Sequence, residues 1–188
     1  MPTSLLPTLH GDRVTLRPFA AEDRAAVLEM LAHPEVERWW GIYDEARYER
    51  DFGDDSVHTY MIEERGSPAG FVMFQPETDP DYEHARIDIA VAGELLDRGL
   101  GTDALRTLLR YLASERGHHR FTIDPAVDNP RAIHVYEKVG FRAVGVTRKS
   151  ERGPDDTWHD NLLMDLLAEE IAGPQYGAPS PRSATMLA

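Results

Sequence analysis

Apolar residues recur along this chain with two periods, one typical of strands and one typical of helices. Residues 12–19 alternate apolar and polar side chains, a pattern that predicts a half-buried strand. Val27, Leu28 and Leu31 then recur at helical spacing. Pro34 is expected to stop this helix, because a proline pushes the preceding residue out of the α conformation. The chain therefore begins with a strand followed by a helix.

The same two patterns predict the remaining elements. Further strands are expected at residues 58–64, 68–75, 86–92, 120–124, 141–150 and 156–168. Further helices are expected at residues 44–52, 98–117 and 129–139. Paired strands dominate the first half of the chain, whereas strands and helices alternate in the second half. This order predicts an α/β protein of the α+β kind.

The length and composition of the chain indicate one domain with a tail. A chain of 188 residues suits a single substantial core. From Gly173 onward the sequence is rich in Pro, Gly, Ser and Ala, so we predict a domain at residues 1–172 and a flexible tail at residues 173–188. Neither an apolar run of about 18 residues nor a secretory signal is evident, so we expect a cytoplasmic protein. The absence of cysteine excludes disulfides and thiolate chemistry.

Acidic residues outnumber basic ones and give the chain a formal net charge of −13. Nucleic-acid phosphates require a basic surface, so nucleic-acid binding is not expected. A cationic small molecule suits this charge, because the field of an acidic protein steers cations toward it. Composition leaves open the alternative that the charge serves solubility alone.

Glycines stand between the strand at 86–92 and the next helix, in the sequence LDRGLGTDAL. Glycines let backbone N–H groups approach a ligand, and a helix N-terminus favours anions, so this loop predicts phosphate binding. Gly99, Gly101 and Ala104 also fit the dinucleotide pattern G-x-G-x-x-A, with Asp124 about 20 residues further on. Its position disfavours that interpretation, because too little chain remains for a second nucleotide-binding half. A purely structural turn stays an alternative, and the absence of G-K-[ST] excludes a P-loop NTPase.

A second motif follows one strand later, at Asn129, Ala132, Tyr136, Lys138, Gly140 and Phe141. Together with the glycine loop it resembles the GNAT superfamily of acyl-CoA-dependent N-acyltransferases, whose second motif is N-x-x-A-x-x-x-Y-x-K-x-G-F. The superfamily's phosphate loop is usually written R/Q-x-x-G-x-G/A. Arg98, Gly99 and Gly101 fit it, but Leu96 stands at the leading position, a departure that affects one phosphate contact and leaves the backbone cradle intact. The resemblance covers residues 13–167.

Four shorter segments are similar to the aminoglycoside 6′-N-acetyltransferases of this superfamily. They are VERWWG at residues 36–41, ETDP in an acidic loop, RID before the phosphate loop, and DPAVDNPRAIHVYEKVGF at residues 124–141. The resemblance implies direct transfer of acetyl from acetyl-CoA to a primary amine, first of all the 6′-amine of an aminoglycoside. Alternative acceptors are a siderophore precursor, a polyamine or a protein N-terminus. A non-catalytic acyl-CoA-binding module is an alternative from a different class.

The implied fold is a mixed, mostly antiparallel, twisted sheet that splays between its fourth and fifth strands and is flanked by about four helices. Acetyl-CoA would lie in the splay, with a backbone N–H of residues 89–91 facing the thioester oxygen as an oxyanion donor. Its pyrophosphate would lie over residues 98–102. The residues expected to bind the cofactor are Ile89, Ala90, Val91, Arg98, Gly99, Leu100, Gly101, Thr102, Asn129 and Ala132.

The resemblance implies two catalytic side chains, Tyr136 and Asp88. Tyr136 lies seven residues after Asn129, two helical turns, so both point to the same side of their helix. Tyr136 would be the general acid that protonates the departing thiolate, and a packed core tyrosine is the alternative. Asp88 would be the base or the anchor of the amine, and a solvent-facing strand aspartate is the alternative.

The expected acceptor is a cationic amine held by aromatic and acidic side chains. Trp39 and Trp40 follow the expected helix stop and suit a sugar ring or an ammonium group, with a hydrophobic cap on the sheet as the alternative. Asp124 matches the superfamily's substrate-binding aspartate, or is a turn residue. Asp79 in the acidic loop and Asp155 before the last strand are further candidates, with solvated loops as the alternative.

Neither a metal site nor a fixed oligomeric state is indicated by the sequence. His118 and His119 are adjacent and His84 is separate, a spacing that does not suit zinc, so no metal is expected. We expect a monomer or a homodimer.

Overall fold

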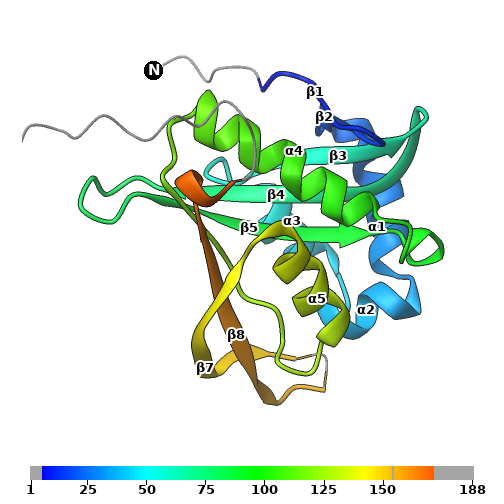
Figure 1. Cartoon of the computed structure of the whole chain (residues 1–188). Helices are drawn as coiled ribbons and strands as arrows, with labels where there is room; N and C mark the ends of the chain where they lie inside the picture. Colours follow the sequence, from blue (N-terminus) through cyan, green and yellow to red (C-terminus); the bar gives the residue numbers. More distant parts are fainter. Residues whose placement is uncertain (1–5, 154, 172–188) are drawn as a thin grey trace, which may run out of the picture.

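A single eight-stranded sheet runs through the computed structural model, which describes residues 6–153 and 155–171 (Figure 1). Its strands are β1 (Leu9–His10), β2 (Thr15–Pro18), β3 (His58–Glu64), β4 (Ser67–Glu77), β5 (His84–Val91), β6 (Arg120–Ile123), β7 (Arg142–Arg152) and β8 (Trp158–Leu167). They lie in the order β1-β2-β3-β4-β5-β6-β8-β7. Of the described neighbours, only β5 and β6 are parallel. The mixed, mostly antiparallel sheet is therefore confirmed.

Helices cover both faces of the sheet (Figure 1). They are α1 (Arg24–Leu31), α2 (Pro34–Trp40), α3 (Glu45–Phe52), α4 (Leu100–Ser114) and α5 (Pro130–Val139). Leu108 of α4 shares a hydrophobic cluster with Phe74 of β4, whereas Val27 of α1 shares a second cluster with Phe71 of β4. Successive side chains of a strand point to opposite faces, so β4 supplies both clusters. Helices α4 and α5 thus lie on one face, and α1 to α3 on the other.

Strands β5 and β6 pair only at their beginnings and then separate. The register joins Ala85 to Phe121 and Arg86 to Thr122, and no further pair of these strands is described. β4 stays paired with the whole of β5, whereas β8 stays paired with β6. The sheet therefore opens beyond Arg86, which confirms the predicted splay between the fourth and fifth expected strands.

Two elements differ from the sequence-based expectation. The short strand β1 has too few residues to show a period, so it was not expected. Helix α2 was also not expected, because Pro34 was interpreted only as a stop. In the structure Pro34 occupies the first turn of α2, where its missing N–H costs little, and His33 Nδ1 accepts the N–H of Glu35 at 3.3 Å. Trp39 and Trp40 consequently lie in the last turn of a helix and not after a helix stop.

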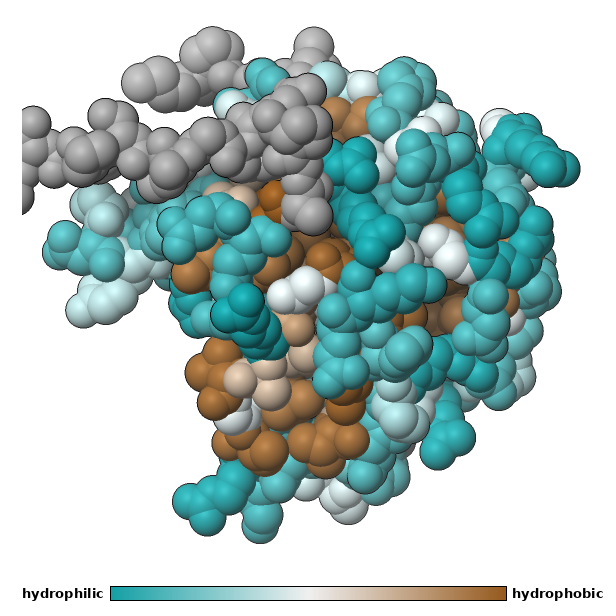
Figure 2. Space-filling view, in the orientation of Figure 1, coloured by the Kyte–Doolittle hydropathy of each residue, from teal (hydrophilic) through white to brown (hydrophobic). Residues whose placement is uncertain are grey.

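The hairpin of β7 and β8 forms the edge of the sheet and carries exposed apolar side chains. Figure 2 shows an apolar area over this hairpin, where Val144, Val146 and Trp158 are exposed. The register of β7 against β8 shifts at two places, and Lys149 has a positive φ of 49°. Shifts in register, and charged side chains such as that of Lys149, disfavour the pairing of a further strand along the edge of a sheet.

The predicted flexible tail, residues 173–188, lies outside the described residues. In the described part of the chain, no helix combines the length and apolarity that crossing a membrane would require.

One carboxylate ties the N-terminal turn to helix α4. Asp103, in the first turn of α4, accepts backbone N–H groups of Asp12 at 3.3 Å, Arg13 at 2.8 Å and Val14 at 3.0 Å. The Arg13 guanidinium in turn donates to the carbonyl oxygen of Arg98. This chain of contacts supports the loop before α4 from behind.

Asp103→Ala is expected to lower the free energy of unfolding by about 2–4 kcal/mol, because it leaves several partly buried N–H donors without an acceptor. Chemical denaturation monitored by circular dichroism measures this change. Asp12→Ala is the matched control, since it keeps the backbone donor of residue 12 and removes an exposed carboxylate. Equal losses in both variants would contradict the anchoring role of Asp103.

Candidate active site

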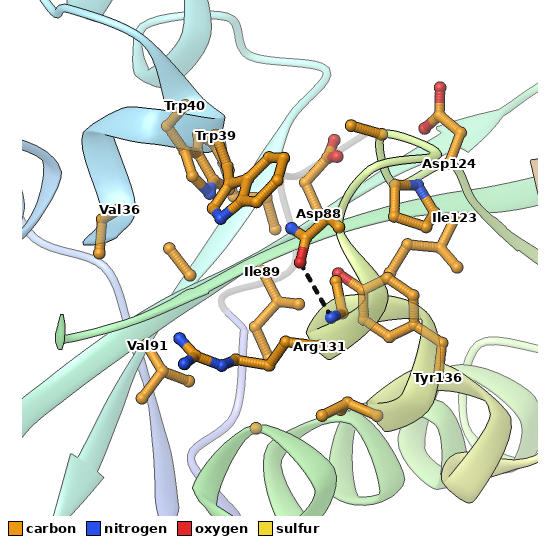
Figure 3. Close-up of a pocket in the computed structure, with 18 of the residues that line it drawn as sticks. Val36, Trp39, Trp40, Asp88, Ile89, Val91, Ile123, Asp124, Arg131 and Tyr136 are labelled. Carbon is orange, nitrogen blue, oxygen red and sulfur yellow. Dashed lines mark hydrogen bonds between the residues drawn. The ribbon is translucent and has the colours of Figure 1, made fainter. Parts of the chain in front are cut away.

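A pocket of about 510 Å³ lies where β5 and β6 separate (Figure 3). Residues of α2, α3, β5, α4, α5 and the segment after β6 line it. The structure brings most of the predicted site residues together here: Trp39, Trp40, Asp88, Ile89, Ala90, Val91, Arg98, Gly99, Leu100, Gly101, Thr102, Asp124, Asn129, Ala132 and Tyr136. Residues that are far apart in the sequence therefore share one cavity.

Asp79 and Asp155 do not line this pocket. Asp79 lies in the loop between β4 and β5, at the end of the hairpin remote from the splay. Asp155 lies in the β7–β8 turn, where His159 and Thr157 hydrogen-bond its carboxylate and lower its pKa to about 2. The structure therefore gives neither carboxylate a place beside the other site residues.

The glycine loop presents free backbone donors to the pocket. Gly99 has a φ of +79°, a left-handed conformation that favours glycine, and α4 has no side-chain hydrogen bond at its N-terminal cap. A Cβ atom on Gly101 would lie 3.4 Å from Cγ2 of Val91, so the helix start packs closely on β5. The first N–H groups of a helix lack intrahelical partners, so this cradle fits a pyrophosphate group.

The side chain of Arg98 is already engaged in the structure. Its guanidinium forms an ion pair with Glu64 of β3 at 2.8 Å. The backbone of the loop, supported by Arg13, is therefore the better-placed phosphate ligand, and the Arg98 side chain is free for phosphate only if it leaves Glu64.

Beyond Arg86, one backbone edge of β5 has no neighbouring strand and faces the splay. The N–H of Ala92 donates to the carbonyl oxygen of Ala69 on the β4 side at 2.9 Å. Backbone groups alternate in direction along a strand, so the N–H groups of Ile89 and Val91 point to the other side, into the gap. An extended ligand arm in the gap can therefore hydrogen-bond to β5 as an added strand would.

Tyr136 reaches from α5 into the pocket, on the side opposite the tryptophans (Figure 3). Its side chain is 7% exposed. Burial raises its pKa, and the nearby carboxylates Asp88 and Asp124 raise it further, so the phenol keeps its proton at neutral pH. Asn129 caps the N-terminus of the same helix, where its side chain accepts the N–H of Ala132 at 3.1 Å. A protonated phenol at this position is equipped to donate a proton.

Asp88 lies on β5 near the middle of the pocket, with its side chain 41% exposed. Enclosure by the pocket walls raises the pKa of Asp88, Arg86 opposes this shift, and Asp124, Glu151 and Asp51 reinforce it. The carboxylate therefore takes up a proton more readily than an ordinary aspartate does, a property that suits a general base.

Trp39 and Trp40 form an aromatic wall on α2. The Trp40 ring packs edge-on against Phe71 at a centroid distance of 5.0 Å, so it also caps the hydrophobic cluster beneath. Trp39 lies 4.9 Å from the Arg38 guanidinium. Both predicted roles, pocket wall and cap on the sheet, thus apply to Trp40, whereas Trp39 lines the pocket without belonging to that cluster.

Several charged pocket residues were not expected from the sequence. Arg131 of α5 pairs with Glu35 of α2 at 3.2 Å and with Asp97 at 3.6 Å, and so links the walls of the pocket. Arg86 pairs with Asp88 at 3.4 Å. Asp51 belongs to α3 and Glu151 to β7. Neither element stands at a fixed spacing from the phosphate loop in the sequence, so no motif predicts that these residues line the pocket.

Comparison with known proteins agrees with this geometry. Residues 13–142 match the family model described as the acetyltransferase (GNAT) domain. The chain belongs to the GNAT acetyltransferase family. It is an acetyl-CoA-dependent N-acetyltransferase, and the predicted fold and enzyme class are confirmed.

The relatives of this GNAT enzyme act on different amines. It is 30% identical over 159 residues to an aminoglycoside N(6′)-acetyltransferase type 1 from Klebsiella pneumoniae, covering 73% of this chain and 78% of the relative. It is 26% identical over 149 residues to spermidine N(1)-acetyltransferase of Escherichia coli K12, covering 74% and 77%. The solved structure of AAC(6′)-Ib with paromomycin and acetyl-CoA superposes with a TM-score of 0.69 at 28% identity, covering 83% of this chain and 94% of that one.

Metal-ligating side chains do not gather in the described part of this enzyme. No group of three or more His, Asp or Glu residues there is arranged to hold a metal ion.

Asp88→Asn is expected to stabilise the enzyme at about pH 8, by up to about 1 kcal/mol after a discount for solvent screening. Folding raises the pKa of Asp88, so at a pH above this raised pKa the charged carboxylate destabilises the folded enzyme. At a pH low enough to protonate Asp88 in both the folded and the unfolded chain, the carboxyl group no longer affects stability. The gain should therefore shrink toward about pH 4. Thermal unfolding across this range measures it, with Asp81→Asn in an exposed loop as the control. A gain that does not change with pH would contradict the assignment.

Proposed function

We propose that this enzyme acetylates a primary amine of a polycationic small molecule, first of all the 6′-amine of an aminoglycoside. The observation that carries the proposal is the acidity of one side of the pocket. The carboxylates of Asp88, Asp124, Glu151 and Asp51 line the same pocket as the guanidinium of Arg86, and all four raise the pKa of that guanidinium. Carboxylates gathered at one point suit an acceptor with several ammonium groups.

The two faces of β5 support a separation of cofactor from acceptor. Ile87 and Ile89 belong to the side of α4 and the phosphate loop. Ala90 belongs to the side of α1 to α3, so Asp88 and Arg86, which alternate with Ile87 and Ile89, face the tryptophans. Acetyl-CoA would thus lie along the splay from the phosphate loop, and the acceptor would enter from the side of α2 and α3.

In the proposed reaction the neutral amine attacks the carbonyl carbon of the thioester. A C–N bond forms, the C–S bond breaks, and the sulfur leaves with the electron pair. Asp88 takes the proton that the amine loses and passes it to solvent, and Tyr136 donates its phenolic proton to the sulfur and recovers one from solvent. The N–H groups of Ile89 and Val91 would stabilise charge on the carbonyl oxygen.

An aminoglycoside is favoured over a linear polyamine by the aromatic wall. Trp39 and Trp40 offer flat surfaces against which a sugar ring can stack, and an ammonium group can lie over an indole face. A polyamine is the second candidate, because the carboxylates alone suffice for it and because the spermidine acetyltransferase is among the relatives. A siderophore precursor and a protein N-terminus need neither feature.

Thiol release from acetyl-CoA across a panel of amines tests the proposal. We expect turnover with kanamycin and none with an aminoglycoside that carries a 6′-hydroxyl in place of the 6′-amine. The KM for kanamycin should rise with salt, because the carboxylates attract it electrostatically. Turnover with spermidine alone would favour the second candidate, and no turnover with either kind of polycation would refute the proposal.

Tyr136→Phe is expected to lower kcat by about 10²-fold or more while the KM for acetyl-CoA changes little, because the hydroxyl acts only as the sulfur leaves. Steady-state kinetics with acetyl-CoA and the best acceptor measure both constants. Tyr82→Phe, on a loop outside the pocket, controls for loss of a tyrosine hydroxyl. An unchanged kcat in Tyr136→Phe would remove this residue from the mechanism.

A further inference from the structure

A cation already occupies the acidic side of the pocket. Arg86 lies at the last paired position of β5 and β6, opposite Thr122, where the sheet begins to open. Its Nη2 atom lies 3.4 Å from the Asp88 carboxylate and its Nε atom 3.9 Å from the Asp124 carboxylate. The guanidinium therefore stands between the two carboxylates that the proposed function assigns to the acceptor.

These two contacts are loose. Both distances exceed the range of good N–H···O hydrogen bonds, and the Arg86 side chain is 54% exposed. Elsewhere in this chain, arginine makes closer pairs, such as Arg120 with Asp165 at 3.1 Å. Within the described residues, neither Asp88 nor Asp124 has another ion-pair partner.

We propose that Arg86 is a resident competitor for the ammonium group of the acceptor. It neutralises Asp88 and Asp124 while the acceptor site is empty, and a cationic acceptor must displace it to reach them. This inference rests on the proposed function, because it assumes that these carboxylates receive an ammonium group. Arg86 is then a residue that sets acceptor affinity and has no part in the bond-forming step.

Other carboxylates near Arg86 can pair with its guanidinium once an acceptor displaces it from Asp88 and Asp124. Asp51 of α3 and Glu151 of β7 line the same pocket as Arg86, so two further carboxylates lie in the cavity that its side chain faces. Asp51 is held by Tyr43, Arg47 and Arg50, whereas Glu151 accepts one hydrogen bond, from Asn161 at 3.0 Å. Glu151 therefore has acceptor capacity left for a guanidinium that turns away from β5.

Removing the positive charge of Arg86 should tighten acceptor binding. In Arg86→Met the side chain keeps most of its length and loses its charge, so an incoming ammonium meets unneutralised carboxylates. We expect the Kd of kanamycin for the CoA-bound enzyme to fall about three- to tenfold, the scale of a partly exposed ion pair. Arg86→Lys keeps the charge and should bind kanamycin about as the wild type does.

Isothermal titration calorimetry at about pH 8 measures these constants for kanamycin and separately for spermidine. Arg120→Gln is the matched control, because it removes one positive charge from the neighbouring strand β6 outside the pocket. An unchanged or weaker Kd in Arg86→Met relative to Arg120→Gln would overturn the inference. So would the absence of binding to both wild type and Arg86→Met.

The inference and the proposed function can fail separately. Tighter binding to Arg86→Met together with no thiol release by the wild type would support the role of Arg86 and refute the reaction. Turnover by the wild type together with weaker binding to Arg86→Met would support the reaction and show that Arg86 assists the acceptor instead of competing with it.

Discussion

The separation of β5 from β6 is the constraint on which the site depends. Backbone N–H and C=O groups inside a sheet are normally paired, yet beyond Arg86 the edge of β5 lies in mid-sheet without a neighbouring strand. The groups that this opening leaves unpaired need a partner, and an extended ligand arm can supply one. β4 pairs with β5 and β8 pairs with β6, so each of the two diverging strands is held on its outer side.

Each element around the gap contributes to the site according to its position beside the gap. Helix α4 begins at one end and directs its free N–H groups toward the opening, whereas α5 places Tyr136 along one side. Successive side chains of β5 point to opposite faces of the sheet, so Ile89 faces the side proposed for the cofactor and Asp88 faces the side of α2 and α3. In the proposed reaction, a single strand would thus hold both reactants apart until they meet at its open edge.

Motifs of fixed spacing made much of this arrangement predictable. The second motif places Asn129 and Tyr136 two helical turns apart, and both line the pocket. Asp51 and Glu151 come from elements whose only relation to the pocket is tertiary, so the sequence offers no spacing that reveals them. Asp79 shows the converse, because an acidic loop looks suitable for a cation until the hairpin places it away from the splay.

The contrast between the net charge of the chain and the local charge of the pocket explains why amino-acid composition alone did not locate the binding site for a cation. The formal charge of −13 is spread over the whole molecule, and exposed charges more than about 8–10 Å apart are largely screened at physiological salt. Many acidic side chains are also paired with arginine on the surface, as Glu45 and Glu49 are with Arg24. Asp88 and Asp124 in the pocket differ from these surface carboxylates, because Arg86 is their only ion-pair partner among the described residues and both contacts are loose. Such a group of charges costs stability in the empty enzyme, and a cation relieves that cost, whether it belongs to the chain or to the acceptor.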